Sequence, residues 1–208
     1  MGGGPAWLGV LAFALLLLGP GALWAADPED PDWPCIQRKV PEISAGMVWA
    51  GPPVEGLEQE WRAEAEVAAL AQRIAARSTS VADGKKAIEA FAARSTTDKD
   101  HRLTLLFAAM LDAVNAERGT IIGGIKRYAQ RQGKLAARIQ QQIEELNQLS
   151  DASSEEQKAR RRELEEQHLW DTRIYEERER SLSYVCEQPV LLEQRIFTLA
   201  REIMMHLD

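Results

Sequence analysis

The chain has 208 residues, of which 45% are hydrophobic, which is enough for one core domain with or without an extension. Its 32 acidic side chains outnumber its 25 lysines and arginines, and the formal net charge is −7. A chain with this balance lacks the surface-wide basic field that recruits phosphate, which argues against a nucleic-acid-binding protein.

Residues 1–26 are predicted to form a secretory signal peptide. An apolar run over residues 7–18 is followed by a Gly-Pro-Gly break and by small residues that suit cleavage after Ala25 or Ala26. The run ends after about a dozen residues, short of the roughly 20 that a membrane span needs. We therefore expect export to the periplasm, or to the extracellular space, and no membrane association after cleavage. Its start lacks Lys and Arg, and retention as an anchor is the alternative.

Residues 27–56 are rich in proline and tryptophan. Proline excludes regular helix here, and the interleaved apolar residues argue against a free tail. We expect an extended strap that lies on a helical body. Trp33 and Trp49 have two interpretations, as residues that pack against this body or as a partner-binding surface.

Cys35 and Cys186 are the only cysteines of the chain. In an oxidising compartment such a pair is expected to form a disulfide, which would tie the strap to the last helical segment. The alternative is two separate thiols.

Residues 57–208 are predicted to be helical throughout. An alanine-rich stretch over 57–77 predicts a first helix, Ser80 with Asp83 predicts the start of a second that ends before Thr96, and Thr97 opens a long third helix. The apolar residues over 103–114 are expected to lie against 190–200, giving a four-helix bundle.

Apolar residues over 121–207 keep a seven-residue repeat in two long segments, interrupted near Ser150. Ser154 with Gln157 has the spacing of a capping box. The expected fold class is therefore all-α: a helical bundle extended by a long antiparallel two-helix coiled-coil hairpin, with a proline-rich N-terminal strap. Its protruding arm covers about residues 125–174.

The charges of the two segments favour the same hairpin. Residues 118–138 are basic, and they would face an acidic stretch over 163–179. This register sets Gln132 opposite Asp171, and Glu144 and Glu145 near the arginines at 160–162. The alternative is that these charges pair only within their own helix.

Three glycines, Gly119, Gly123 and Gly124, lie within six residues of the third helix. We expect them to allow close approach of the strap or of the facing helix, with a flexing point as the alternative, because helical glycine is otherwise unfavourable. Pro189 is expected to kink the last helix or to divide it.

The sequence offers one metal-binding hypothesis, in which Glu165, His168 and Asp171 provide ligands from one helix face. A dinuclear site would need a second such set and two further carboxylates, and the chain lacks a suitably placed copy. No haem-attachment, phosphate-loop or nucleophile motif is present. We therefore expect no enzymatic activity and no cofactor.

The favoured function is that of an exported, non-enzymatic helical protein that binds a protein partner as an adaptor, scaffold or holding chaperone. The candidate partner-binding residues are Arg160, Arg161, Arg162, Trp33 and Trp49. For the arginines, the alternative is a solvated helix face. A periplasmic metal-binding protein is the alternative function, and homo-oligomerisation is also open.

Overall fold

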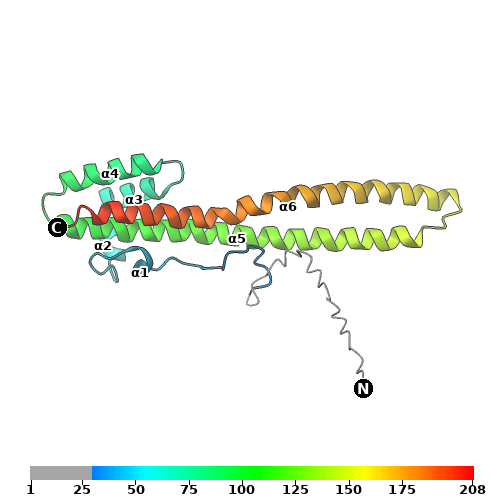
Figure 1. Ribbon diagram of the computed structural model, residues 1–208, viewed down its shortest axis with the longest axis horizontal. Coiled ribbons are helices and arrows are strands. Elements are labelled where there is room, and N and C mark those ends of the chain that lie inside the picture. Colours follow the sequence, from blue (N-terminus) through cyan, green and yellow to red (C-terminus); the bar gives the residue numbers. More distant parts are fainter. Residues whose placement is uncertain (1–29) are drawn as a thin grey trace, which may run out of the picture.

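The computed structural model describes residues 30–208, and this part of the chain consists of helices and connecting segments without β-strands. The signal-peptide prediction lies outside the described residues. Two long antiparallel helices form a hairpin, and shorter helices surround the end that lies far from its turn (Figure 1). The elements are α1 (Ala45–Val48), α2 (Glu58–Ala63), α3 (Ala65–Ala75), α4 (Val81–Arg94), α5 (Lys99–Gln148) and α6 (Glu155–Met204).

The hairpin turn lies between α5 and α6, where the sequence predicts it. The Ser154 hydroxyl accepts a hydrogen bond from the backbone N–H of Gln157 at 3.1 Å, and the Gln157 side chain accepts one from the Ser154 N–H at 3.2 Å. This reciprocal capping box satisfies backbone donors that the first turn of α6 would otherwise leave free. The predicted all-α hairpin and its capping box are confirmed.

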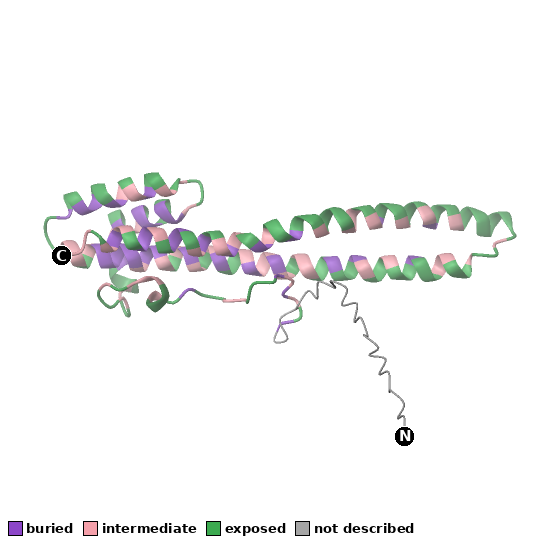
Figure 2. Ribbon diagram, in the orientation of Figure 1, coloured by how far each residue is buried: buried purple, intermediate pink, exposed green. Residues whose placement is uncertain are grey.

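The hydrophobic core lies at the base of the hairpin, where α3 packs on α5 and α4 packs on α6 (Figures 1 and 2). Residues 103–114 of α5 and 190–200 of α6 share this core, as the sequence predicts. Large side chains that are fully buried here include Ile74, Ile88, Phe91, Leu103, Leu106, Phe107, Met110, Leu192, Ile196 and Leu199.

A buried arginine donates hydrogen bonds to backbone carbonyls at the C-terminal end of α3 and in the segment that follows. Arg195 of α6 donates hydrogen bonds to the carbonyl oxygens of Ile74, at 2.7 Å from Nη2, and of Thr79, at 2.6 Å. Burial lowers the pKa of this guanidinium. Carbonyls in the last turn of a helix have no intrahelical partner, so Arg195 satisfies groups that would otherwise be buried without one.

The predicted first helix over 57–77 is wrong in its continuity, because the structure divides it into α2 and α3 at Glu64. Glu64 has an extended backbone, with φ −95° and ψ 95°, and its carboxylate accepts a hydrogen bond from Arg102 Nε at 2.6 Å. No glycine or proline marks this break, which coincides with an ion pair to a distant helix.

The cap of α5 is Asp98, one residue after the predicted Thr97.

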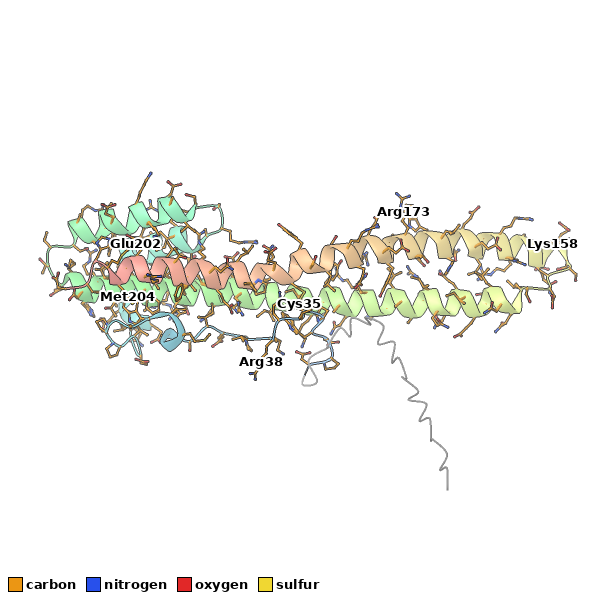
Figure 3. All side chains as sticks on the ribbon, in the orientation of Figure 1. Cys35, Arg38, Lys158, Arg173, Glu202 and Met204 are labelled. Atoms are coloured by element: carbon orange, nitrogen blue, oxygen red, sulfur yellow. A yellow bond between two sulfur atoms is a disulfide. The ribbon has the colours of Figure 1, made fainter. Side chains whose placement is uncertain are left out.

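The strap is held to the hairpin by a disulfide and by a buried arginine. Cys35 and Cys186 are joined, with their Cα atoms 5.5 Å apart (Figure 3 labels Cys35). Arg118 of α5 is 4% exposed and donates hydrogen bonds to the carbonyls of Val40, at 3.0 Å, and Pro189, at 2.6 Å. One guanidinium therefore joins the strap, α5 and α6.

Further polar contacts hold the strap at Ile43 and at Asp30. The side-chain amide of Asn115 accepts a hydrogen bond from the N–H of Ile43 and donates one to its carbonyl. Asp30 pairs with Lys126 of α5 at 3.0 Å and with Lys39 of the strap, and these two cations hold the pKa of Asp30 at about 2. The strap is therefore a packed part of the described fold.

The two predictions about backbone irregularities have different outcomes. Pro189 lies inside α6 and does not divide it, because the helix continues to Met204, and the expected kink at Pro189 stays a prediction. A Cβ added at Gly119 would meet no described atom within 4 Å, and those at Gly123 and Gly124 would meet only the Arg127 guanidinium of the same helix. Close approach of the strap or of α6 therefore does not explain the three glycines.

Candidate protein-binding arm

The arm, residues 125–174, extends beyond the core and has little interior of its own. Its buried residues are three apolar ones, Ile125, Leu135 and Leu164, and three polar ones, Gln132, Gln142 and Asp171. Figure 2 shows the loss of buried surface from the base of the hairpin towards its turn. Since burial of apolar area supplies most of the free energy of folding, this half of the hairpin is stabilised less than the base.

A carboxylate at the centre of the arm joins its two helices. Asp171 of α6 accepts hydrogen bonds from Arg138 of α5, at 2.7 Å from Nε and 2.5 Å from Nη2, and from Gln142 at 2.8 Å. The Arg138 guanidinium is the main cause that lowers the pKa of Asp171. The predicted pairing of Asp171 with Gln132 is wrong, because the Gln132 amide donates to the carbonyl of Tyr175 instead.

Two of the three candidate metal ligands, Asp171 and Glu165, take part in other interactions. Asp171 is occupied by Arg138, and Glu165 accepts a hydrogen bond from Arg161 at 2.9 Å. Over residues 30–208, no group of three His, Cys, Asp or Glu side chains is arranged to hold a metal ion. His168 is half-buried, and its Nδ1 has no described hydrogen-bond partner.

The arginines at the tip differ in what they contact. Arg160 pairs with Glu145 of α5 at 2.9 Å, as the hairpin register predicts, and also with Glu163. Arg161 binds Glu165 and donates to the Ser150 carbonyl in the turn at 3.3 Å. Arg162 is exposed and forms no ion pair with a described residue. Of the three predicted partner-binding arginines, Arg162 is therefore the one whose guanidinium has no ion-pair partner among the described residues.

The two tryptophans of the strap lie against the helical body. Trp33 is 3% exposed, packs with the disulfide, and donates a hydrogen bond from Nε1 to the Gln37 carbonyl at 2.7 Å. Trp49 stacks on Phe107 with the ring centroids 4.1 Å apart. Both positions agree with the packing interpretation, and the partner-binding interpretation has no exposed ring to support it.

Two exposed apolar residues on α6, Leu169 and Trp170, were not among the residues predicted from the sequence. Their exposed fractions are 69% and 64%, although they occupy the middle of the arm. Both fall outside the seven-residue repeat that predicts the contact with α5, which is why that repeat gives them no role. An exposed apolar patch surrounded by polar residues is a feature of protein-binding surfaces.

A cleft of about 410 Å³ opens where the strap meets the base of the arm. It contains the buried Gln132, whose Oε1 has no described hydrogen-bond partner, and Tyr128, whose hydroxyl donates to the Arg178 carbonyl. Burial raises the pKa of Tyr128. The lining residues are Pro34, Tyr128, Ala129, Gln132, Tyr175, Glu179 and Leu182.

No protein-family model matches the chain, and the searches of curated proteins and of solved structures find no match either. Among the helices of residues 30–208, none combines the length and the apolar character that a membrane crossing requires.

Proposed function

We propose that this protein is an exported, non-enzymatic helical protein that acts by binding another protein through its arm, as an adaptor or scaffold. The observation that carries the proposal is the exposed pair Leu169 and Trp170 on an arm whose interior is half polar. Tryptophan is among the residues that most often anchor protein interfaces.

The shape of the arm supports the same proposal. Half of each long helix leaves the core and gains little buried apolar area, so the arm adds length without adding much stability (Figure 2). A structure of this kind suits contact with a second molecule at a distance from the base.

The chemistry of the arm's surface favours an adaptor over a holding chaperone. Within the arm, the exposed large apolar residues are Ile143, Leu169 and Trp170, and charged side chains surround them. A chaperone that holds unfolded chains needs a wider apolar surface, whereas isolated anchors among charges suit one specific partner.

The proposed location is the periplasm. The disulfide between Cys35 and Cys186 supports it, because such bonds persist in oxidising compartments, and so does the apolar N-terminal pattern of the sequence. Mass spectrometry of the mature protein tests the export proposal, since cleavage after Ala25 or Ala26 is the expected result.

The partner-binding proposal is tested by cross-linking in cells. A photoreactive residue is placed singly at exposed sites on the arm, at Asp151 in the turn and at Leu169 on α6. The matched control carries it at Glu89, an exposed residue of α4 at the opposite end of the hairpin.

One dominant partner captured from the arm, and not from Glu89, is the expected result. A broad set of unrelated exported proteins would favour the chaperone function. If the arm captures no protein, neither a different chain nor a second copy of this one, the proposed function fails.

A further inference from the structure

We infer that the outer face of α6 binds a second copy of this chain, in antiparallel orientation, with a two-fold axis between Leu169 and Trp170. The inference rests on the proposed function, the binding of protein by the arm, and identifies one partner. It is argued from the order of the side chains along this face.

One stripe of side chains follows the face of α6 that points away from α5. Apart from an adjacent pair at its centre, its members are spaced by three or four residues, which places them on one side of a helix. All are exposed, and Figure 3 shows Arg173 projecting away from α5. The residues of this outer stripe are Arg162, Glu166, Leu169, Trp170, Arg173 and Glu177.

The charges of the outer stripe are arranged so that the stripe complements itself. From the tip towards the base, the order is cation, anion, apolar pair, cation, anion. When a second stripe runs in the opposite direction about the same centre, Arg162 lies opposite Glu177 and Glu166 lies opposite Arg173. Each pairing occurs twice, which is the property of a two-fold symmetric interface.

The centre of this arrangement is apolar. Leu169 and Trp170 of one copy would contact Trp170 and Leu169 of the other, and both side chains are more than half exposed in the single chain. Burial of an apolar centre within a charged rim is the usual anatomy of a protein interface. An unrelated partner would have to supply the reverse pattern of charges, whereas a second copy already carries it.

The outer stripe forms few ion pairs within the single chain, so its charged side chains are available to bind a second copy. Arg162 and Glu166 form no ion pair with a described residue, and Arg173 pairs only with Glu177 in its own helix, at 3.2 Å. The side chains of that pair are 72% and 55% exposed, so it contributes little to the stability of the chain. The same charges can therefore pair between copies at small cost.

The antiparallel orientation also fits the shape of the molecule. The helices α3 and α4 lie at the end of the hairpin far from the turn, and no described element covers the outer stripe (Figure 1). Two overlapping arms place these bases at opposite ends. A parallel arrangement would instead set like charges of the outer stripe against each other.

The expected dimer is reversible and sensitive to salt. The outer stripe spans roughly 24 Å at 1.5 Å per residue, so the contact is smaller than a standard stable interface. Its flanking ion pairs are exposed and are weakened by screening. Sedimentation of the purified, disulfide-bonded mature chain should therefore show a monomer–dimer equilibrium that shifts towards monomer at high salt.

Charge reversal tests the pairing directly. In Glu166→Arg, two arginines face each other at both symmetric positions, and in Arg173→Glu two glutamates do. Each variant alone is expected to dimerise roughly tenfold or more weakly, because like charges are brought together. An equimolar mixture of the two variants restores both opposite-charge contacts, so a heterodimer of near wild-type affinity is expected.

The matched controls carry the same charge changes away from the outer stripe. They are Glu89→Arg on α4 and Lys134→Glu on α5, both at exposed positions without an ion pair to a described residue. Neither should change the dimer. Circular dichroism and thermal unfolding of every variant separate loss of pairing from loss of the fold.

A wild-type chain that sediments as a monomer at every concentration overturns the inference, and so does a mixture of Glu166→Arg and Arg173→Glu that stays monomeric while both variants are folded. If the chain is monomeric but the arm captures a different protein in cells, the proposed function stands and the second copy is excluded. If neither binding is found, both fail.

Discussion

Asp171 of α6 accepts two hydrogen bonds from the guanidinium of Arg138, which reaches it from α5 at 2.7 and 2.5 Å. The carboxylate is 7% exposed, and the arm around it buries few apolar groups. Since removal of one partner leaves a buried charge poorly compensated, this pair contributes to the contact between the two helices of the arm.

The first prediction concerns the substitution Arg138→Met. Asp171 would keep only Gln142 as a side-chain partner, so the arm should lose about 1 to 3 kcal/mol of stability. Hydrogen exchange should increase in the arm, with little change around the core residues of the base. Asp171→Asn together with Arg138→Met removes the charge as well and should recover part of the loss. Equal exchange in wild type and in Arg138→Met would contradict this role.

The second prediction concerns acid. The pKa of Asp171 is lowered in the folded chain by Arg138, so its stabilising contribution is present above the ordinary value of 3.8. That contribution is lost as the pH falls from there towards the folded pKa, because the unfolded chain then binds the proton more readily. Helicity followed by circular dichroism should show Arg138→Met melting at higher pH than wild type. Coincident acid transitions would refute the prediction.

A third prediction compares Arg118 of the hairpin with Arg77, which lies between α3 and α4. Arg118 is buried and joins the strap to both long helices, whereas Arg77 pairs with Glu117 at the surface with 51% of its side chain exposed. Arg118→Met should cost about 2 to 4 kcal/mol, because buried carbonyls lose their donor. Arg77→Met should cost less than about 1 kcal/mol. Denaturant titration measures both, and similar losses would be inconsistent with this ranking.

The disulfide provides the fourth prediction. Cys35 and Cys186 are 151 residues apart, and the chain-entropy model assigns about 5 kcal/mol to a loop of this length, as an upper figure. The double variant Cys35→Ser/Cys186→Ser should unfold at lower denaturant concentration and should expose residues 30–43 to hydrogen exchange. Reductant should have the same effect on wild type and none on the variant. Unchanged protection of the strap would show that Arg118 and Asn115 hold it without the disulfide.

The fifth prediction concerns the helical glycines. Added Cβ atoms at Gly119 and Gly133 meet no described atom within 4 Å, so alanine fits both positions. Because helical glycine costs about 0.5 to 1 kcal/mol relative to alanine, each substitution should raise the midpoint of thermal unfolding. Partner capture that is lost in Gly119→Ala but retained in Gly133→Ala would indicate that flexibility near residue 119 serves binding. A lowered midpoint for Gly119→Ala would point to a contact outside the described residues.

The hairpin and its turn could be predicted because they depend on local signals. The seven-residue repeat determines which faces of α5 and α6 meet, and Ser154 with Gln157 caps α6 through contacts three residues apart. The cysteine pair could be predicted because the chain has no other cysteine. Each of these features follows from residue type and spacing alone.

The roles of individual charged residues could not be predicted in the same way. Arg118 and Arg195 are buried where backbone carbonyls from distant segments accept their hydrogen bonds. A repeat in the sequence does not indicate which distant carbonyls will meet a given arginine. The break at Glu64 likewise coincides with its ion pair to Arg102. Asp171 was assigned the wrong partner because the repeat fixes helix faces, whereas a long guanidinium selects contacts a turn or more away.

The positions of the two cysteines also determine when the disulfide can form as the chain is made. Cys35 belongs to the strap and Cys186 lies late in the last helix, so in a chain that emerges N-terminus first the strap appears long before its bonding partner. During that interval the Cys35 thiol lacks this partner, and the bond forms only after α5 and the part of α6 up to residue 186 have been delivered. The oxidised protein is therefore chemically distinguishable from any chain that stopped short of residue 186.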